Sequence, residues 1–141
     1  MNRETIIAAL FDRLTGLPGL VTISRRLKHW ADVPAAEQPA LFLTCGNSAP
    51  EQTRGLPPKW RLQATLHLYV NTGGDDRLSP SAQLNELLDA IEAALAPTGG
   101  EPAQTLGGLV SHAWISGAIE TDEGVLGDQG VAILPLEILV P

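Results

Sequence analysis

The sequence contains an uninterrupted alternation of apolar and polar side chains over residues 60 to 70, Trp60-Arg61-Leu62-Gln63-Ala64-Thr65-Leu66-His67-Leu68-Tyr69-Val70. Successive side chains on a β-strand point to opposite faces of a sheet, so this pattern predicts a strand with one dry face and one polar face. The dry face needs a covering layer, and the polar face is left for solvent or a partner. We therefore expect a sheet that is packed against a core on one side only.

Two segments outside this strand carry apolar residues at helical spacing. The first covers about residues 3 to 15, with Asn2 as a plausible N-cap. The second has Ser79 as its expected N-cap and Pro80 at its first position, and it ends before Pro97. Each segment is apolar on one side only, so we expect both helices to lie side by side on the dry face of the sheet.

Four further segments have the composition of β-strands. They cover about residues 21 to 25, 40 to 44, 108 to 120 and 130 to 140. The resulting order is α-β-β-β-α-β-β, which predicts an α+β fold with a single mixed, mostly antiparallel sheet of about five strands and two helices on one face. We expect one domain over residues 1–141, long loops at 46 to 59 and 121 to 130, and an edge or bulge at Pro135.

Composition limits the classes of function. The chain has 141 residues, a net charge of -7 and a pI near 4.8, which argues against general binding to phosphate backbones. The single cysteine, Cys45, excludes an intramolecular disulfide and a cysteine-cluster metal site, and we expect it to be buried and inert. No apolar stretch approaches the roughly 18 to 20 residues that cross a bilayer, and the N-terminus is too charged for a signal peptide. We expect a soluble chain that is not exported and does not bind a membrane.

Catalytic and metal-binding patterns are weak in this sequence. The three histidines, His29, His67 and His112, lie far apart, and no pair has the i, i+4 spacing that holds a metal on a helix. The acidic pairs Asp75-Asp76 and Asp122-Glu123 lack the spacing of a calcium loop, and no glycine pattern forms a phosphate loop. We therefore expect no catalytic residues, no cofactor and no metal.

The candidate interface consists of charged residues at a strand end and in the two loops, together with one tryptophan. The basic cluster beside Trp30 fits a solvated strand end, a protein contact or, less readily in an acidic chain, nucleic acid. Acidic pairs in a turn fit solvation or pairing with a neighbouring subunit. The candidate interface residues are Arg25, Arg26, Lys28, Trp30, Arg54, Asp122, Glu123 and Asp128. A rival interpretation is a small binding module that recognises a ligand or nucleic acid on the open sheet face through Arg61, His67 and Tyr69.

Several segments together resemble small phage and prophage proteins of the tail terminator type. They are Trp30-Ala31-Asp32-Val33, Gln38-Pro39-Ala40-Leu41-Phe42-Leu43, Gln104-Thr105-Leu106-Gly107-Gly108-Leu109-Val110, Trp114, Thr121-Asp122-Glu123-Gly124 and Ile138-Leu139-Val140-Pro141. The resemblance runs through most of the chain and rests on structural glycines, prolines and tryptophans rather than on catalytic groups.

This resemblance implies a non-enzymatic subunit of the virion tail that is assembled in the bacterial host cytoplasm. Tail terminators form a ring of their own copies, commonly a hexamer, which caps the tail tube protein, halts its polymerisation and presents a surface to the head-tail connector protein. The alternative within the virion is a head-tail joining or completion protein. If the loop at 46 to 59 makes such contacts, deletion of residues 48 to 56 should weaken assembly while the monomer stays folded.

Overall fold

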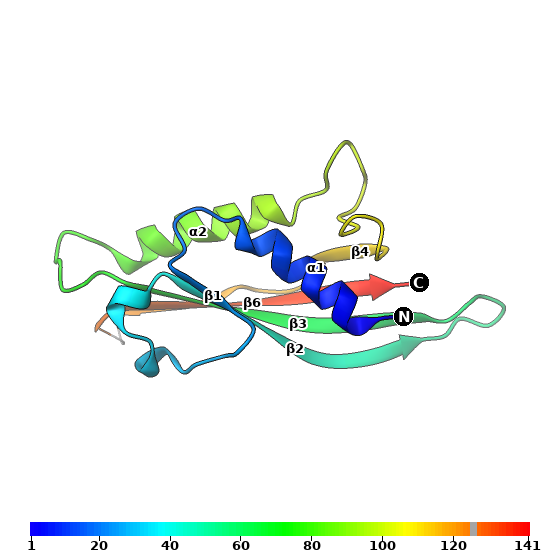
Figure 1. Ribbon diagram of the computed structural model, residues 1–141, viewed down its shortest axis with the longest axis horizontal. Helices are drawn as coiled ribbons and strands as arrows, with labels where there is room; N and C mark the ends of the chain where they lie inside the picture. The colour runs from blue at the N-terminus through cyan, green and yellow to red at the C-terminus, as the bar shows by residue number, and fades with distance from the viewer. Residues whose placement is uncertain (125–126) are drawn as a thin grey trace.

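Six strands form one sheet beneath two helices in the computed structural model, which describes residues 1–124 and 127–141 (Figure 1). Two short 3-10 turns, η1 and η2, lie between β1 and β2. The elements in chain order are α1 (Arg3–Thr15), β1 (Thr22–Ser24), η1 (Trp30–Asp32), η2 (Ala35–Glu37), β2 (Ala40–Glu51), β3 (Lys59–Asn71), α2 (Pro80–Ala94), β4 (His112–Ile115), β5 (Glu120–Gly124) and β6 (Gly127–Val140).

The sheet has the strand order β1-β2-β3-β6, and both β4 and β5 pair with the far side of β6. Only the β1–β2 pair is parallel among the strands described, and the other pairs are antiparallel. The predicted α+β fold with a mixed, mostly antiparallel sheet is therefore confirmed. β3 lies at its centre, paired with β6 from Trp60 opposite Val140 to Asn71 opposite Gln129.

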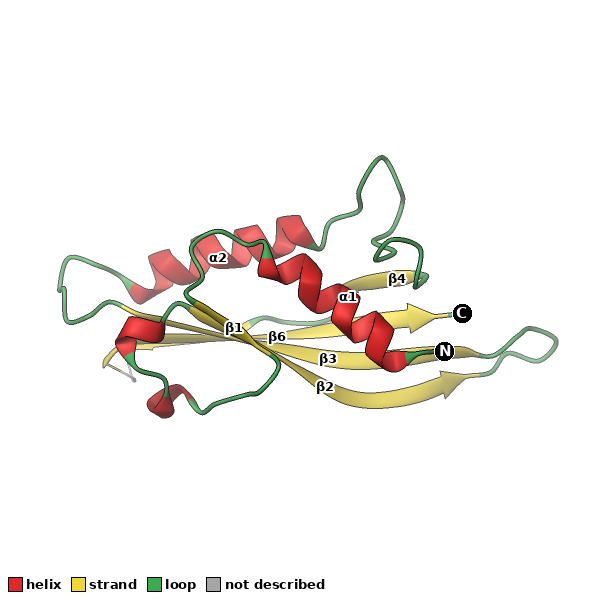
Figure 2. Cartoon of the chain, in the orientation of Figure 1, coloured by secondary structure: helices red, strands yellow, loops and turns green. Residues whose placement is uncertain are grey.

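The predicted dry face of β3 forms the sheet side of the hydrophobic core. Its side chains from Leu62 to Val70 are at most 3% exposed, and both helices cover them from the same side (Figure 2). The residues that meet there from the two helices and the sheet include Leu10, Leu14, Leu66, Leu68, Leu84, Ile91, Leu134 and Ile138. Removal of this apolar surface from water, at roughly 25 cal/mol per Å², is what holds the helices on the sheet.

The N-termini of the two helices are capped differently. In α1 the predicted cap is present, because Asn2 Oδ1 accepts a hydrogen bond of 3.0 Å from the Thr5 amide. In α2, Pro80 occupies the first turn as predicted, but Ser79 makes no side-chain cap. Glu123 of β5 takes that role, since its carboxylate accepts a hydrogen bond of 2.7 Å from the Ser81 amide. A partner distant in sequence has replaced the local cap.

The prediction of a long loop at 46 to 59 is wrong. β2 continues to Glu51 and β3 begins at Lys59, so the two strands form a long hairpin whose connection covers only residues 52 to 58. The pairing register shifts between Cys45 and Ser48, which marks a β-bulge. This end of β2 is exposed on both faces. A solvated edge needs no apolar alternation, and so the sequence pattern did not reveal it.

The prediction of one strand over 108 to 120 is wrong, because this segment contains β4 and the start of β5. The sheet therefore has six strands instead of about five. A turn with positive φ at Gly107 and Gly108 precedes β4, and residues 116 to 119 separate β4 from β5. The expected loop at 121 to 130 is also wrong, because β5 and β6 pair as a hairpin up to Gly124 opposite Gly127. Its positions 125 and 126 lie outside the described residues.

Pro135 lies in the interior of the sheet rather than at an edge. Its carbonyl accepts a hydrogen bond of 2.9 Å from the Ser116 amide, on the side of β6 where β4 ends and β5 begins. In a β-strand the N–H and C=O groups of one residue point to the same side. The nitrogen of Pro135, which carries no hydrogen, therefore points to the gap between β4 and β5 and not to β3. The proline therefore removes no hydrogen bond from the β3–β6 ladder.

Candidate assembly interface

The sheet face away from the helices, which we call the outer face, is covered at one end by the segment 28–38. Beneath that segment Val33, Ala40, Phe42 and Tyr69 form a second, small apolar cluster, against which Trp30 packs. Tyr69 Oη donates a hydrogen bond of 2.7 Å to the Lys28 carbonyl, and Gln129 Nε2 donates one of 3.2 Å to the Trp30 carbonyl. The predicted open polar face is thus closed at this end, and two hydrogen bonds from the sheet fix the position of Trp30.

The other end of the outer face carries a charged cluster that crosses four strands. Arg61 of β3 donates to Glu51 of β2, with an Nε–Oε1 distance of 2.7 Å, and also to Glu137 of β6. Its guanidinium carbon lies 5.7 Å from the ring centre of Trp114 on β4. The hydrogen bonds to Glu51 and Glu137 raise the pKa of Arg61 above its ordinary value. The contacts of this cluster link β2, β3, β6 and β4 across the outer face.

A shallow groove of about 490 Å³ lies on the outer face between the segment 28–38 and β5. Val131 and Ile133 of β6 line it, with Trp30 on one side and the carboxylates Glu120 and Asp122 on the other. Glu120 and Asp122 are exposed and pair in register with Ile133 and Val131. The groove therefore combines apolar surface with a negatively charged wall, which suits a partner segment that carries both an apolar and a basic side chain.

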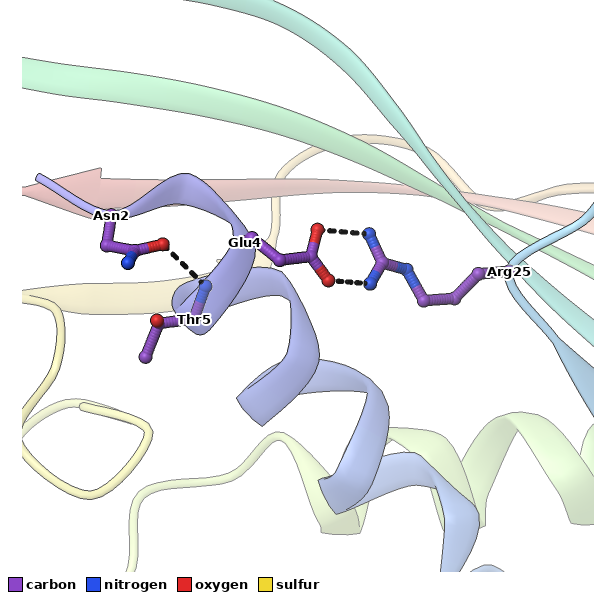
Figure 3. Close-up of polar contacts among 4 residues, drawn as sticks. All are labelled: Asn2, Glu4, Thr5 and Arg25. Atoms are coloured by element: carbon purple, nitrogen blue, oxygen red, sulfur yellow. Dashed lines mark hydrogen bonds and ion pairs between the residues drawn. The ribbon is translucent and has the colours of Figure 1, made fainter.

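The predicted basic cluster is divided by the fold. Arg25 makes a two-pronged ion pair with Glu4 of α1, next to the Asn2 cap (Figure 3), and its hydrogen bond lowers the pKa of Glu4. Arg26 and Lys28 are exposed. Trp30 turns to the groove instead of lying between the cations. The cluster is thus a partly paired strand end, and only its tryptophan belongs to a shaped site.

The remaining candidate residues lie at opposite ends of the molecule. Arg54 is in the tip of the β2–β3 hairpin, beyond the C-terminal end of β6 (Figure 1). Asp122 faces the groove, whereas Glu123, one residue on, faces the helices and caps α2. Asp128 is exposed, and its main-chain carbonyl accepts a hydrogen bond of 2.8 Å from Thr72. The structure therefore brings Trp30 and Asp122 together and keeps Arg54 apart from both.

The rival interpretation as a binding module requires Arg61, His67 and Tyr69 to be free on an open sheet face, and the structure does not place them so. Tyr69 is 4% exposed, with its hydroxyl engaged, and Arg61 is paired with two carboxylates. His67 is half-buried, and burial lowers its pKa below the ordinary value of 6.5. None of the three offers a flat, free surface for stacking a base. The prediction that Cys45 is buried is wrong, because its side chain is exposed at the point where the pairing register of β2 shifts.

Sequence reasoning missed the apolar part of the groove and an exposed apolar residue in the hairpin tip. Val131 and Ile133 alternate with buried residues in β6, and a strand that is apolar on both faces signals that both faces are covered or meet a partner. Leu56 follows Gly55 and precedes Pro57-Pro58, and it is 60% exposed. The sequence pattern that could have indicated an exposed contact residue here was a single leucine among glycine and prolines.

Comparison with solved structures finds the same fold elsewhere. One match is a chain from a structure described as the virion of a native gene transfer agent particle, with a TM-score of 0.54 and 12% sequence identity over 94% of this chain and 92% of that one. A second solved structure has a TM-score of 0.50 and 20% identity over 98% of this chain and 96% of that one. No protein family matches the sequence, and no curated protein does. At these identities the likeness concerns the fold.

The described part of the chain contains neither a cluster of metal-binding side chains nor a membrane-spanning helix. No group of three or more His, Cys, Asp or Glu side chains among residues 1–124 and 127–141 could hold a metal ion. No helix in those residues has the length and hydropathy to cross a membrane.

Proposed function

We propose that the chain is a structural subunit of a phage-like tail, a tail terminator that forms a ring on the end of the tail tube. The observation that carries the proposal is the fold shared along nearly the whole chain with a chain of a gene transfer agent virion. The resemblance to tail terminators is drawn from the sequence and not from the fold, so it is a separate line of support. It also suggests a component of a phage-like particle.

The surface of the chain is compatible with assembly into a ring. It has a groove of mixed apolar and acidic character at one end of the sheet and a projecting hairpin with an exposed leucine at the other. Two different patches on one subunit favour head-to-tail contacts, which close into a ring when the rotation per subunit is right. In this role the ring, of six copies as the resemblance implies, would cap the tube protein and meet the connector protein.

Electron microscopy of particles tests the proposal. Particles are induced from the bacterium that carries the sequence and labelled with an antibody raised against the purified chain. We expect label at the head-proximal end of the tail, and we expect abnormally long tubes after deletion of the coding sequence. Label at the same position with tubes of normal length would favour a head-tail joining protein instead. Particles without label at that end would contradict the proposal.

A further inference from the structure

We propose that the tip of the β2–β3 hairpin of one copy docks in the outer-face groove of the next copy. We call residues 52–58 the arm, and the residues Trp30, Glu120, Asp122, Val131 and Ile133 the groove. This inference rests on the proposed ring-forming role and assigns the surfaces that would build the ring. The partner is a second copy of this chain.

The arm has a defined backbone conformation. Residues Thr53 to Leu56 form a tight turn, closed by a hydrogen bond of 2.9 Å from the Leu56 amide to the Thr53 carbonyl. Gly55, the third residue of the turn, has a positive φ of 84°, as in a type II turn, where glycine is favoured. Pro57 and Pro58 restrict the chain that follows. A pre-ordered segment loses little conformational freedom on binding, which favours its use as a contact.

The side chains of the arm complement those of the groove. Leu56, 60% exposed, matches the apolar surface of Val131 and Ile133. Arg54, exposed at the corner of the turn, matches the carboxylates of Glu120 and Asp122. An apolar contact flanked by an opposite-charge pair is the arrangement that gives both affinity and orientation at a protein interface.

An arm cannot reach the groove of its own chain. Tyr69 pairs with Val131 at the groove, and Lys59 lies ten positions earlier on the same strand, next to the arm. At about 3.3 Å per residue the two ends of β3 are roughly 33 Å apart, and the arm projects still farther in the opposite direction (Figure 1). Each copy therefore offers one arm and one groove at opposite ends, and a contact between them joins copies head to tail.

Charge reversal on each side of the contact tests the inference. The arm variant is Arg54→Glu, and the groove variant is Glu120→Arg with Asp122→Arg; all three positions are exposed, so the monomer should stay folded, as circular dichroism will show. Self-association is measured by sedimentation over a range of concentrations. We expect each variant alone to associate about tenfold or more weakly than the wild type, as for a residue at the centre of an interface.

Mixing the two variants distinguishes this contact from any other. In an equimolar mixture, the native arm of the groove variant meets the native groove of the arm variant, and the reversed arm meets the reversed groove. The mixture should therefore recover association, as should one chain that carries all three substitutions. Matched controls are Arg77→Glu, at a side chain 91% exposed, and Asp89→Arg on α2. We expect both controls to associate like the wild type, alone and mixed.

Three outcomes overturn the inference: variants that associate like the wild type, a mixture that recovers nothing, or a wild-type chain that stays monomeric at every concentration. These outcomes are separate from the test of the proposed function. If charge reversal has no effect and yet the antibody labels the tail end, the arm contact is wrong and the terminator role stands. If the mixture recovers and no label is found, the contact stands and the role is wrong.

Discussion

The hydroxyl of Tyr69 donates a 2.7 Å hydrogen bond to the main-chain carbonyl of Lys28, forty-one residues earlier in the chain. Tyr69 is on the polar side of the alternating strand, yet it is almost fully buried. The bond holds the segment 28–38 on the outer face and so places Trp30 beside the groove. A residue that looked available for a ligand serves instead to position one side of the candidate interface.

Substitution of Tyr69 by Phe should loosen that segment without disturbing the sheet. The change removes only the hydroxyl, so the Lys28 carbonyl loses its donor at a cost of about 1 kcal/mol in the free energy of unfolding. Amide hydrogen exchange of residues 28–38 should become faster, while exchange in β3 and β6 should not change. Uniformly faster exchange across the sheet would contradict this local role.

Substitution of Gly130 by Ala should weaken the packing of α2. An added Cβ would lie 2.9 Å from Pro80 Cβ, closer than real contacts come, and 3.0 Å from Leu84 Cδ1, which is an unusually tight contact. We expect a loss of about 1–3 kcal/mol in urea unfolding, typical of overpacking. Gly16→Ala is the matched control, because its Cβ would meet nothing within 4 Å and its φ is -83°. Equal stability of the two variants would show that α2 does not need this close approach.

Substitution of Glu123 by Gln should destabilise α2 from a distance of forty-two residues. The carboxylate accepts the Ser81 amide and places a negative charge at the positive end of the helix. The neutral amide keeps an acceptor and loses the charge, so we expect a loss of about 0.3–1 kcal/mol that diminishes at high salt. Asp122→Asn removes the same charge from the other face of β5 and should have a smaller effect. Equal effects would indicate general charge repulsion rather than a cap.

Stability should fall below about pH 6.5 because of His67. Burial lowers the folded-state pKa of this imidazole below the ordinary value of 6.5, so the unfolded chain binds a proton first as the pH decreases. The resulting loss of stability begins near pH 6.5 and levels off once the pH passes below the folded-state pKa. In His67→Gln, urea midpoints between pH 7.5 and 5 should fall less steeply than in the wild type. Parallel curves for the two proteins would contradict the assignment.

The sequence alone determined the local structure that depends on short-range patterns. Alternation from Trp60 to Val70 identified the central strand and its buried face, and Asn2 marked the start of α1. These features follow from the fixed geometry of strands and helix ends, in which near neighbours decide whether a residue is buried or capped.

Tertiary structure decided the features that join distant parts of the chain. The sequence identified Trp30, Arg54 and Asp122 as interface candidates, but only the fold brings Trp30 to Asp122 and carries Arg54 to the opposite end of the sheet. Likewise, only strand pairing makes a hairpin of the expected loop at 46 to 59 and gives the cap of α2 to Glu123. The physical reason is that contacts between strands are set by register and sheet order, which depend on the whole chain and not on any short segment of it.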